Sequence, residues 1–152
     1  MAAATRMLGA ATVVVAALGA TPASAQISVG TWQRTDAAGK GITMTVEQCC
    51  NGGRRLTYHI PPMGNQPATT LTVASPMDGS DAPALMAGKP TGETMAIKRI
   101  DELHYTTTVK MNGQPFATST TTGTADGKTL TVETTQLSGG QNTKVVETWI
   151  KQ

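Results

Sequence analysis

Two adjacent cysteines are the most reactive pair in this 152-residue chain. Cys49 and Cys50 are its only cysteines. Adjacent α-carbons lie about 3.8 Å apart, which is below the usual separation in a disulfide. By the alternation of the preceding residues, Cys49 is expected to face outward and Cys50 inward. Three states stay open, in order of preference: free thiols, a disulfide-linked homodimer through Cys49, and a disulfide within the pair.

Further soft metal ligands are present, but their spacing does not suit a metal site. His59, His104 and six methionines after residue 25 carry donors that copper, zinc or haem iron accept. However, the chain has no Cys-x-x-Cys, His-x-His or methionine run. Both histidines also share the polar face of their segments, His59 with Thr57 and His104 with Thr106. We therefore expect no metal site and no cofactor, and metal or haem binding is the weakest of the functions considered.

No arrangement typical of an enzyme is visible. Ser75, Ser80 and Ser119 have no catalytic motif around them, and neither histidine falls on an apolar face. Asp101 and Glu102 are adjacent, so on a strand they would point to opposite sides. We expect no catalytic residues and a protein that is not an enzyme.

The charges are few and evenly spread. The net charge is +2, and neither sign forms a run of any length. Nucleic acid and anionic membrane surfaces are therefore not predicted as partners.

The first 25 residues have the pattern of a cleaved export signal. A short positive start is followed by an apolar run over 7–20 and a small-residue cleavage site at 23–25. The run is too short to span a bilayer. We expect a single β-barrel domain over 26–152, periplasmic or extracellular in a bacterium, with no membrane insertion after cleavage.

Period-two alternation predicts that this domain is all-β. Ile42, Met44 and Val46 alternate with polar residues, and the same pattern recurs along the chain, while helical periodicity is nearly absent. Asn112-Gly113 and Asp126-Gly127 favour tight hairpins. An antiparallel up-and-down meander of about eight or nine strands is expected, near 27–34, 41–48, 54–60, 69–75, 93–100, 102–111, 115–123, 128–136 and 143–151.

Two proline-rich segments, 61–67 and 76–92, are expected to lie outside the strands and near the mouth of a barrel. The second is predicted to be a surface connection. The alternative is a lid over an opening, with Leu85 and Met86 pointing inward.

The two tryptophans stand near the two ends of the domain. An up-and-down sheet closes when its first and last strands pair, which also removes its exposed edges. Trp32 and Trp149 would then lie close to this seam, with at least one of them plugging one end of the barrel. A β-sandwich shows the same alternation and stays open as an alternative.

Gly30-Thr31-Trp32 resembles the G-x-W signature of the calycins, the lipocalin, fatty-acid-binding and avidin-like barrels. Segments 126–135 and 143–151 resemble the closing hairpin of small exported bacterial lipocalin-like proteins of unknown function. The resemblance implies a lipocalin-like barrel closed by Gly30, Trp32 and Trp149. A T-D-Y motif is absent, and only Lys144 or Lys151 could be the basic residue that lies over the tryptophan in that family.

The inward-facing residues of such a barrel carry the functional prediction. An interior of this size either holds one small ligand or is filled by side chains. We predict non-covalent binding of a small, largely apolar molecule, with Tyr58 and Tyr105 as polar groups. The alternative is a solid barrel that acts as an envelope interaction or structural protein. Polar wall residues are expected at Thr118, Thr120 and Thr122. The lumen candidates are Leu56, Tyr58, Leu71, Val73, Leu85, Met86, Met95, Ile97, Tyr105, Met111 and Phe116.

Overall fold

The computed structural model describes residues 27–137 and 142–152. The predicted export signal and its cleavage site lie outside the described residues. Within these two ranges, no helix is both long and apolar enough to cross a membrane.

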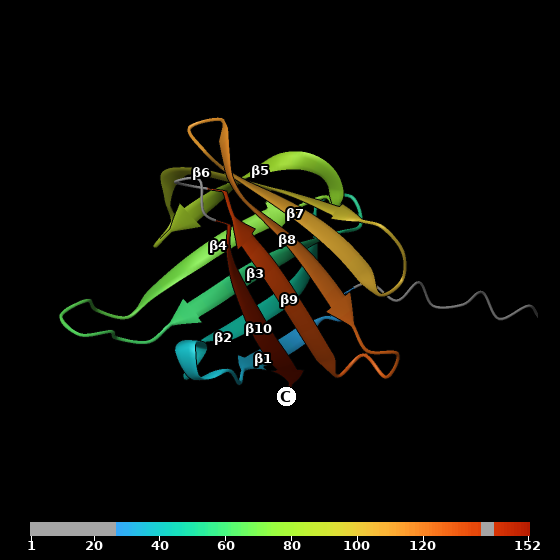
Figure 1. Cartoon of the computed structure of the whole chain (residues 1–152), viewed down its shortest axis with the longest axis horizontal. Coiled ribbons are helices and arrows are strands. Elements are labelled where there is room, and N and C mark those ends of the chain that lie inside the picture. Colours follow the sequence, from blue (N-terminus) through green and yellow to red (C-terminus); the bar gives the residue numbers. More distant parts are fainter. Residues whose placement is uncertain (1–26, 138–141) are drawn as a thin grey trace, which may run out of the picture.

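Ten antiparallel strands form one closed barrel (Figure 1). Each strand pairs with the next one along the chain, and the first pairs with the last. The predicted all-β meander is confirmed, but with ten strands rather than eight or nine. A short 3-10 helix, η1 (Ala37–Gly39), joins the first two strands. The strands are β1 (Gly30–Arg34), β2 (Thr43–Cys49), β3 (Gly53–Ile60), β4 (Thr69–Ser75), β5 (Asp78–Met86), β6 (Lys89–Arg99), β7 (His104–Met111), β8 (Gln114–Gly123), β9 (Thr129–Gln136) and β10 (Thr143–Lys151).

The seam between β1 and β10 closes the barrel as predicted. Trp32 lies opposite Lys151, and Arg34 lies opposite Trp149. Both tryptophans belong to the same core cluster, with 1% and 2% of their surfaces exposed. The β-sandwich alternative is therefore wrong.

The expectation for residues 76–92 is wrong, because this segment is a β-hairpin and contributes the tenth strand. It contains all of β5 and the first residues of β6. The inward residues of β5 are Ala82 and Ala84, which are almost fully buried. Alanines give little apolar contrast, so the alternation is hard to see in the sequence. Pro83 is accommodated because the ladder between β5 and β6 shifts register just after it.

The meander places the turns in two sets, one at each end of the barrel. The closed end, on the right in Figure 1, carries residues 27–29, 50–52, 76–77, 100–103 and 124–128. The open end, on the left and at the top, carries η1 and the connections at 61–68, 87–88 and 112–113.

Candidate functional site: the barrel interior

A cavity of about 360 Å³ occupies the barrel interior. This is many times the volume that one water needs and falls within the range of small-molecule pockets. Its lining residues come from every strand except β5. Most are aliphatic or aromatic, and they include Ile60 and Gln136 at the last positions of β3 and β9. The cavity therefore extends to the open end.

Seven of the predicted lumen residues line this cavity: Leu56, Tyr58, Leu71, Met95, Ile97, Tyr105 and Phe116. The other four do not. Val73 is fully buried in a second core cluster with Ala82 and Ala84. Leu85 lies opposite Thr72, which alternates with the lining residue Leu71, so Leu85 belongs to the outer face.

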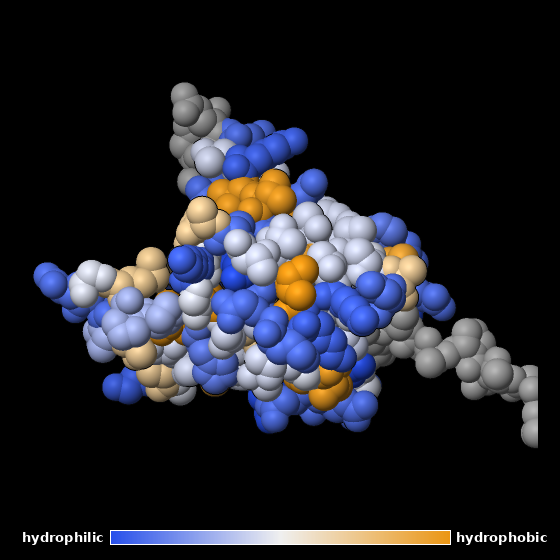
Figure 2. All heavy atoms as spheres, turned by 90° about the horizontal axis from the view of Figure 1, so that it is seen from below, coloured by the Kyte–Doolittle hydropathy of each residue, from blue (hydrophilic) through white to orange (hydrophobic). Residues whose placement is uncertain are grey.

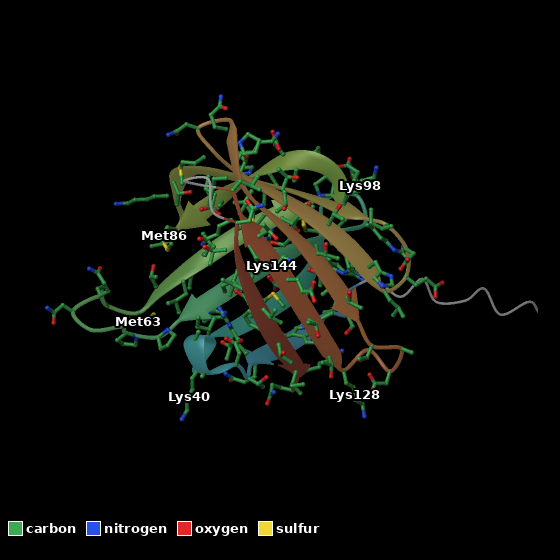
Figure 3. The ribbon with its side chains drawn as sticks, in the orientation of Figure 1. Lys40, Met63, Met86, Lys98, Lys128 and Lys144 are labelled. Atoms are coloured by element: carbon green, nitrogen blue, oxygen red, sulfur yellow. A yellow bond between two sulfur atoms is a disulfide. The ribbon has the colours of Figure 1, made fainter. Side chains whose placement is uncertain are left out.

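The remaining two, Met86 and Met111, are more than a third exposed at the open end. Figure 3 shows Met86 on the same side of the molecule as Met63 in the 61–68 connection. Leu137, just after β9, is also exposed. Four successive hairpins thus each carry one exposed large apolar residue at this end. On the face drawn in Figure 2, hydrophobic residues form a few separate groups among polar ones.

A bulge in β8 changes which residues make the wall polar. The register between β7 and β8 shifts after Val109, so Phe116 is an extra residue and Ala117 also faces the cavity. Beyond the bulge, Ser119 and Thr121 line the interior. The expectation for Thr118, Thr120 and Thr122 is wrong because the alternation reverses at the extra residue. Those three threonines do not line the cavity.

Trp32 and the first described residues seal the closed end. The Trp32 indole Nε1 donates to the Ser28 carbonyl at 3.2 Å. Lys151, opposite Trp32, donates from Nζ to Ser28 Oγ at 3.1 Å. A Cβ at Gly30 would lie 3.1 Å from Lys151 Cε, so the glycine leaves room for the lysine. Trp32 and residues 27–29 form a plug at the closed end. A side-chain hydrogen bond as well as the strand ladder connects this plug to the last strand.

Two side chains hold the backbone of Ile27 at the closed end. Its N–H donates to the Tyr105 hydroxyl at 2.8 Å, and its carbonyl accepts from Arg54 Nε at 2.9 Å. Arg54 also donates to the Gly53 carbonyl at 2.9 Å and is itself buried. Tyr105 therefore anchors the closed end, in addition to lining the cavity.

An ion cluster centred on Arg34 lies at the cavity wall beside the seam. The guanidinium pairs with Asp36 through Nε at 2.7 Å and Nη2 at 2.9 Å, and with Glu147 through Nη1 at 3.0 Å. The Arg34 side chain is only 12% exposed. Hydrogen bonding to Arg34 lowers the Asp36 pKa, and the two carboxylates raise the Arg34 pKa. Such paired, charge-assisted bonds fix the guanidinium in place.

Glu147 connects this cluster to the aromatic part of the wall. Its second carboxylate oxygen accepts from Trp149 Nε1 at 3.1 Å. Trp149 packs edge-on against Tyr58, with ring centroids 5.8 Å apart and an interplanar angle of 65°. Among the described residues, no group hydrogen-bonds the Tyr58 hydroxyl. Burial and, to a smaller extent, the charge of Glu147 raise the Tyr58 pKa.

Glu93 is the second carboxylate in the wall, and its situation differs from that of Glu147. It shares the inward parity of Met95 and Ile97 on β6 and lines the cavity. Burial raises its pKa, with no charged neighbour to oppose the effect. Within the part of the chain that the structure describes, its carboxylate has no ion-pair or hydrogen-bond partner.

Sequence reasoning missed Arg34, Glu93 and Glu147 as wall residues. The signal was present for all three, because each lies two residues from an apolar neighbour of inward parity: Trp32, Met95 and Trp149. A charged residue on the apolar face of a strand is unusual enough to indicate a site.

The cysteines form a disulfide with each other, so the preference for free thiols is wrong. Cys49 ends β2 and Cys50 is exposed in the following turn, so Cys50 does not face the interior. The homodimer through Cys49 stays a prediction, and it would require this bond to open.

The histidines lie on the outer surface. His59 contacts Thr45 Oγ1 at 3.2 Å, and His104 pairs with Asp101 at 2.8 Å. Over the described ranges, no group of three or more His, Cys, Asp or Glu side chains is placed to hold a metal ion.

Comparisons of the chain with protein-family models, with curated proteins and with solved structures found no match.

Proposed function

We propose that this protein binds one small, largely apolar molecule non-covalently in the barrel interior, through the open end, and is not an enzyme. The observation that carries the proposal is the 360 Å³ cavity, whose wall is mostly apolar. Transfer of apolar surface from water into such a space contributes roughly 25 cal/mol per Å². The alternative of a solid envelope protein needs a filled interior, which a cavity of this size disfavours.

We also propose that the barrel is of the lipocalin-like, calycin type. Trp32 at the closed end, Gly30 beside it and Lys151 opposite it support the proposal, because a basic residue of the last strand then approaches the tryptophan's strand. Export to an oxidising compartment is part of the same proposal. The N-terminal pattern and the Cys49–Cys50 disulfide support it.

A pair of variants on one strand tests the binding function. Ser119 lines the cavity, and Thr120 is exposed on the outer face of the same wall. We expect wild-type protein to enhance the fluorescence of N-phenyl-1-naphthylamine saturably. Ser119→Phe should fill the cavity and reduce this binding at least about tenfold, while Thr120→Phe should leave it unchanged.

Equal loss in both variants, or no binding by the wild type, would contradict the proposal. Native mass spectrometry of protein purified from its own host then identifies the retained molecule by mass.

A further inference from the structure

We propose that the ligand is a cationic amphiphile, an apolar body that carries an ammonium group, and that Glu93 is its counter-ion. This inference rests on the proposed function, because it assigns the chemical class of the molecule that occupies the same cavity.

The arginine in the wall is not available to an acidic ligand. Three of its nitrogens are bound to Asp36 and Glu147, and two of these bonds form a bidentate pair with one carboxylate. A fatty acid or another anion would have to displace a carboxylate that the fold holds in place. A buried guanidinium usually indicates an anion site, but here the carboxylates of Asp36 and Glu147 already balance its charge.

The charges around the cavity sum to a negative value. Arg34 is the cation among the lining residues, against the carboxylates of Glu93 and Glu147. Outside the lining, Asp36 beside Arg34 and the buried Arg54 at the closed end offset each other, so the lining residues leave a net charge of −1. In a wall partly shielded from water, such an excess disfavours an anionic guest and favours a cation.

Of the two glutamates, Glu93 is the one left for a ligand. Glu147 uses one oxygen for Arg34 and the other for Trp149. Glu93 makes no such contact among the described residues, and burial penalises its charged form. A partly desolvated carboxylate without a partner is costly, and an ammonium group would offset that cost.

The position of Glu93 suits a ligand whose apolar body enters first and whose ammonium group stays near the open end. It lies opposite Met111, the last residue of β7, near the open end. Along the same strand, Met95 and Ile97 line the cavity progressively deeper, towards the closed end. An ammonium at Glu93 therefore leaves the apolar body in contact with the apolar wall below it.

The two lysines at the open-end termini of β6 and β7 do not take this role. Lys110 pairs with Asp81 at 2.8 Å on the outer surface. Lys89, at the start of β6, is exposed to solvent, where its charge is screened by salt.

Calorimetric titration with three probes of equal chain length tests the charge preference. Decylamine, decanol and decanoate are added at pH 7.5, below the concentrations at which they aggregate. We expect decylamine to bind about tenfold more tightly than decanol, and decanoate to bind more weakly than decanol. Decanoate binding as tightly as decylamine would overturn the cationic assignment and leave the apolar site standing. Failure of all three probes and of N-phenyl-1-naphthylamine would overturn the proposed function and this inference with it.

A matched pair of variants tests Glu93 itself. Glu93→Gln should remove the roughly tenfold advantage of decylamine over decanol. Glu133→Gln removes the same charge from an exposed position on β9 and should keep the advantage. An advantage that survives Glu93→Gln, or that is lost equally in both variants, would overturn the assignment of Glu93.

Discussion

The two ends of the barrel are built from the same ten strands but differ in how their polar groups are treated. At the closed end, Trp32 fills the interior, and Arg54 and Tyr105 hold both backbone groups of Ile27. Towards the open end, Glu93 faces the cavity with no partner in the described part of the chain. The Tyr58 hydroxyl, which also faces the cavity, is in the same situation.

This difference indicates which end contributes stability and which end could recognise a ligand. A buried polar group that has a partner stabilises the native state, whereas one without a partner is costly until something binds it. The closed end therefore contributes stability, and the open end holds the unsatisfied groups through which a ligand would be recognised. Substitutions of comparable residues at the two ends test this division.

The largest expected difference in unfolding free energy is between Trp32→Ala and Leu71→Ala. Trp32 is 1% exposed and packed on all sides, so its loss should cost about 3–5 kcal/mol of unfolding free energy. Leu71 borders the cavity and has fewer contacts to lose, so we expect about 1–2 kcal/mol. Denaturant unfolding of both variants measures the difference. Equal costs would mean that the interior is as tightly packed beside Leu71 as around Trp32.

The next comparison uses two buried glycines. A Cβ at Gly53, at the closed end, would fall on the backbone of Ser75 and Pro76, so Gly53→Ala should cost about 2–3 kcal/mol. A Cβ at Gly39 in η1 would fall on the Arg34 side chain, which can shift only by loosening its bonds to Asp36 and Glu147, so Gly39→Ala should cost about 1–2 kcal/mol, less than Gly53→Ala. Thermal unfolding measures both. A larger cost for Gly39→Ala would show that the Arg34 cluster is as rigid as the closed end.

Two tyrosine hydroxyls give a smaller contrast. Tyr105→Phe removes the acceptor of the Ile27 N–H, and an unpaired buried donor should cost about 1–2 kcal/mol. Tyr58→Phe removes a hydroxyl that has no protein partner among the described residues, so the unfolding free energy should change by less than about 0.5 kcal/mol. Urea unfolding distinguishes the two. A Tyr58→Phe cost equal to that of Tyr105→Phe would contradict the difference between the ends.

The smallest expected effect is the loss of unfolding free energy at low pH. Asp36 at the open end and Asp101 at the closed end both have pKa values below the usual 3.8, mainly through Arg34 and through the Leu103 N–H respectively. A lowered folded-state pKa contributes stability that is present above about pH 4 and is lost as the pH falls through the folded value. Unfolding free energies at pH 7, 4 and 2.5 should therefore decline mainly in the last step, and less so in Asp36→Asn and Asp101→Asn. An unchanged decline in both variants would contradict these pairings.

Much of the barrel could be predicted from the sequence, because alternation such as Ile42, Met44 and Val46 reports one buried face directly. The same rule failed at β5, where the inward residues are alanines with almost no apolar contrast. It failed again in β8, where a bulge at Phe116 reverses the alternation beyond it. Local sequence does not encode a bulge, because the partner strand determines where the extra residue is accommodated.

The candidate site was only half predictable for a related reason. Apolar wall residues such as Leu56 and Met95 follow from parity alone. Glu93 and Glu147 share that parity, but charged residues are usually assigned to the solvent face. Their partners, or the absence of partners, depend on residues brought together only by closure of the barrel.

The most direct test of a ligand site that is sealed at one end and open at the other uses the indole N–H signals of the two tryptophans in proton–nitrogen correlation spectra. Trp149 lines the cavity, whereas Trp32 lies in the plug and does not. Titration with N-phenyl-1-naphthylamine should shift the Trp149 signal, assigned with Trp149→Phe, and leave the Trp32 signal in place. A shift of the Trp32 signal alone, or of neither signal at saturation, would contradict an interior that is open at one end and sealed at the other.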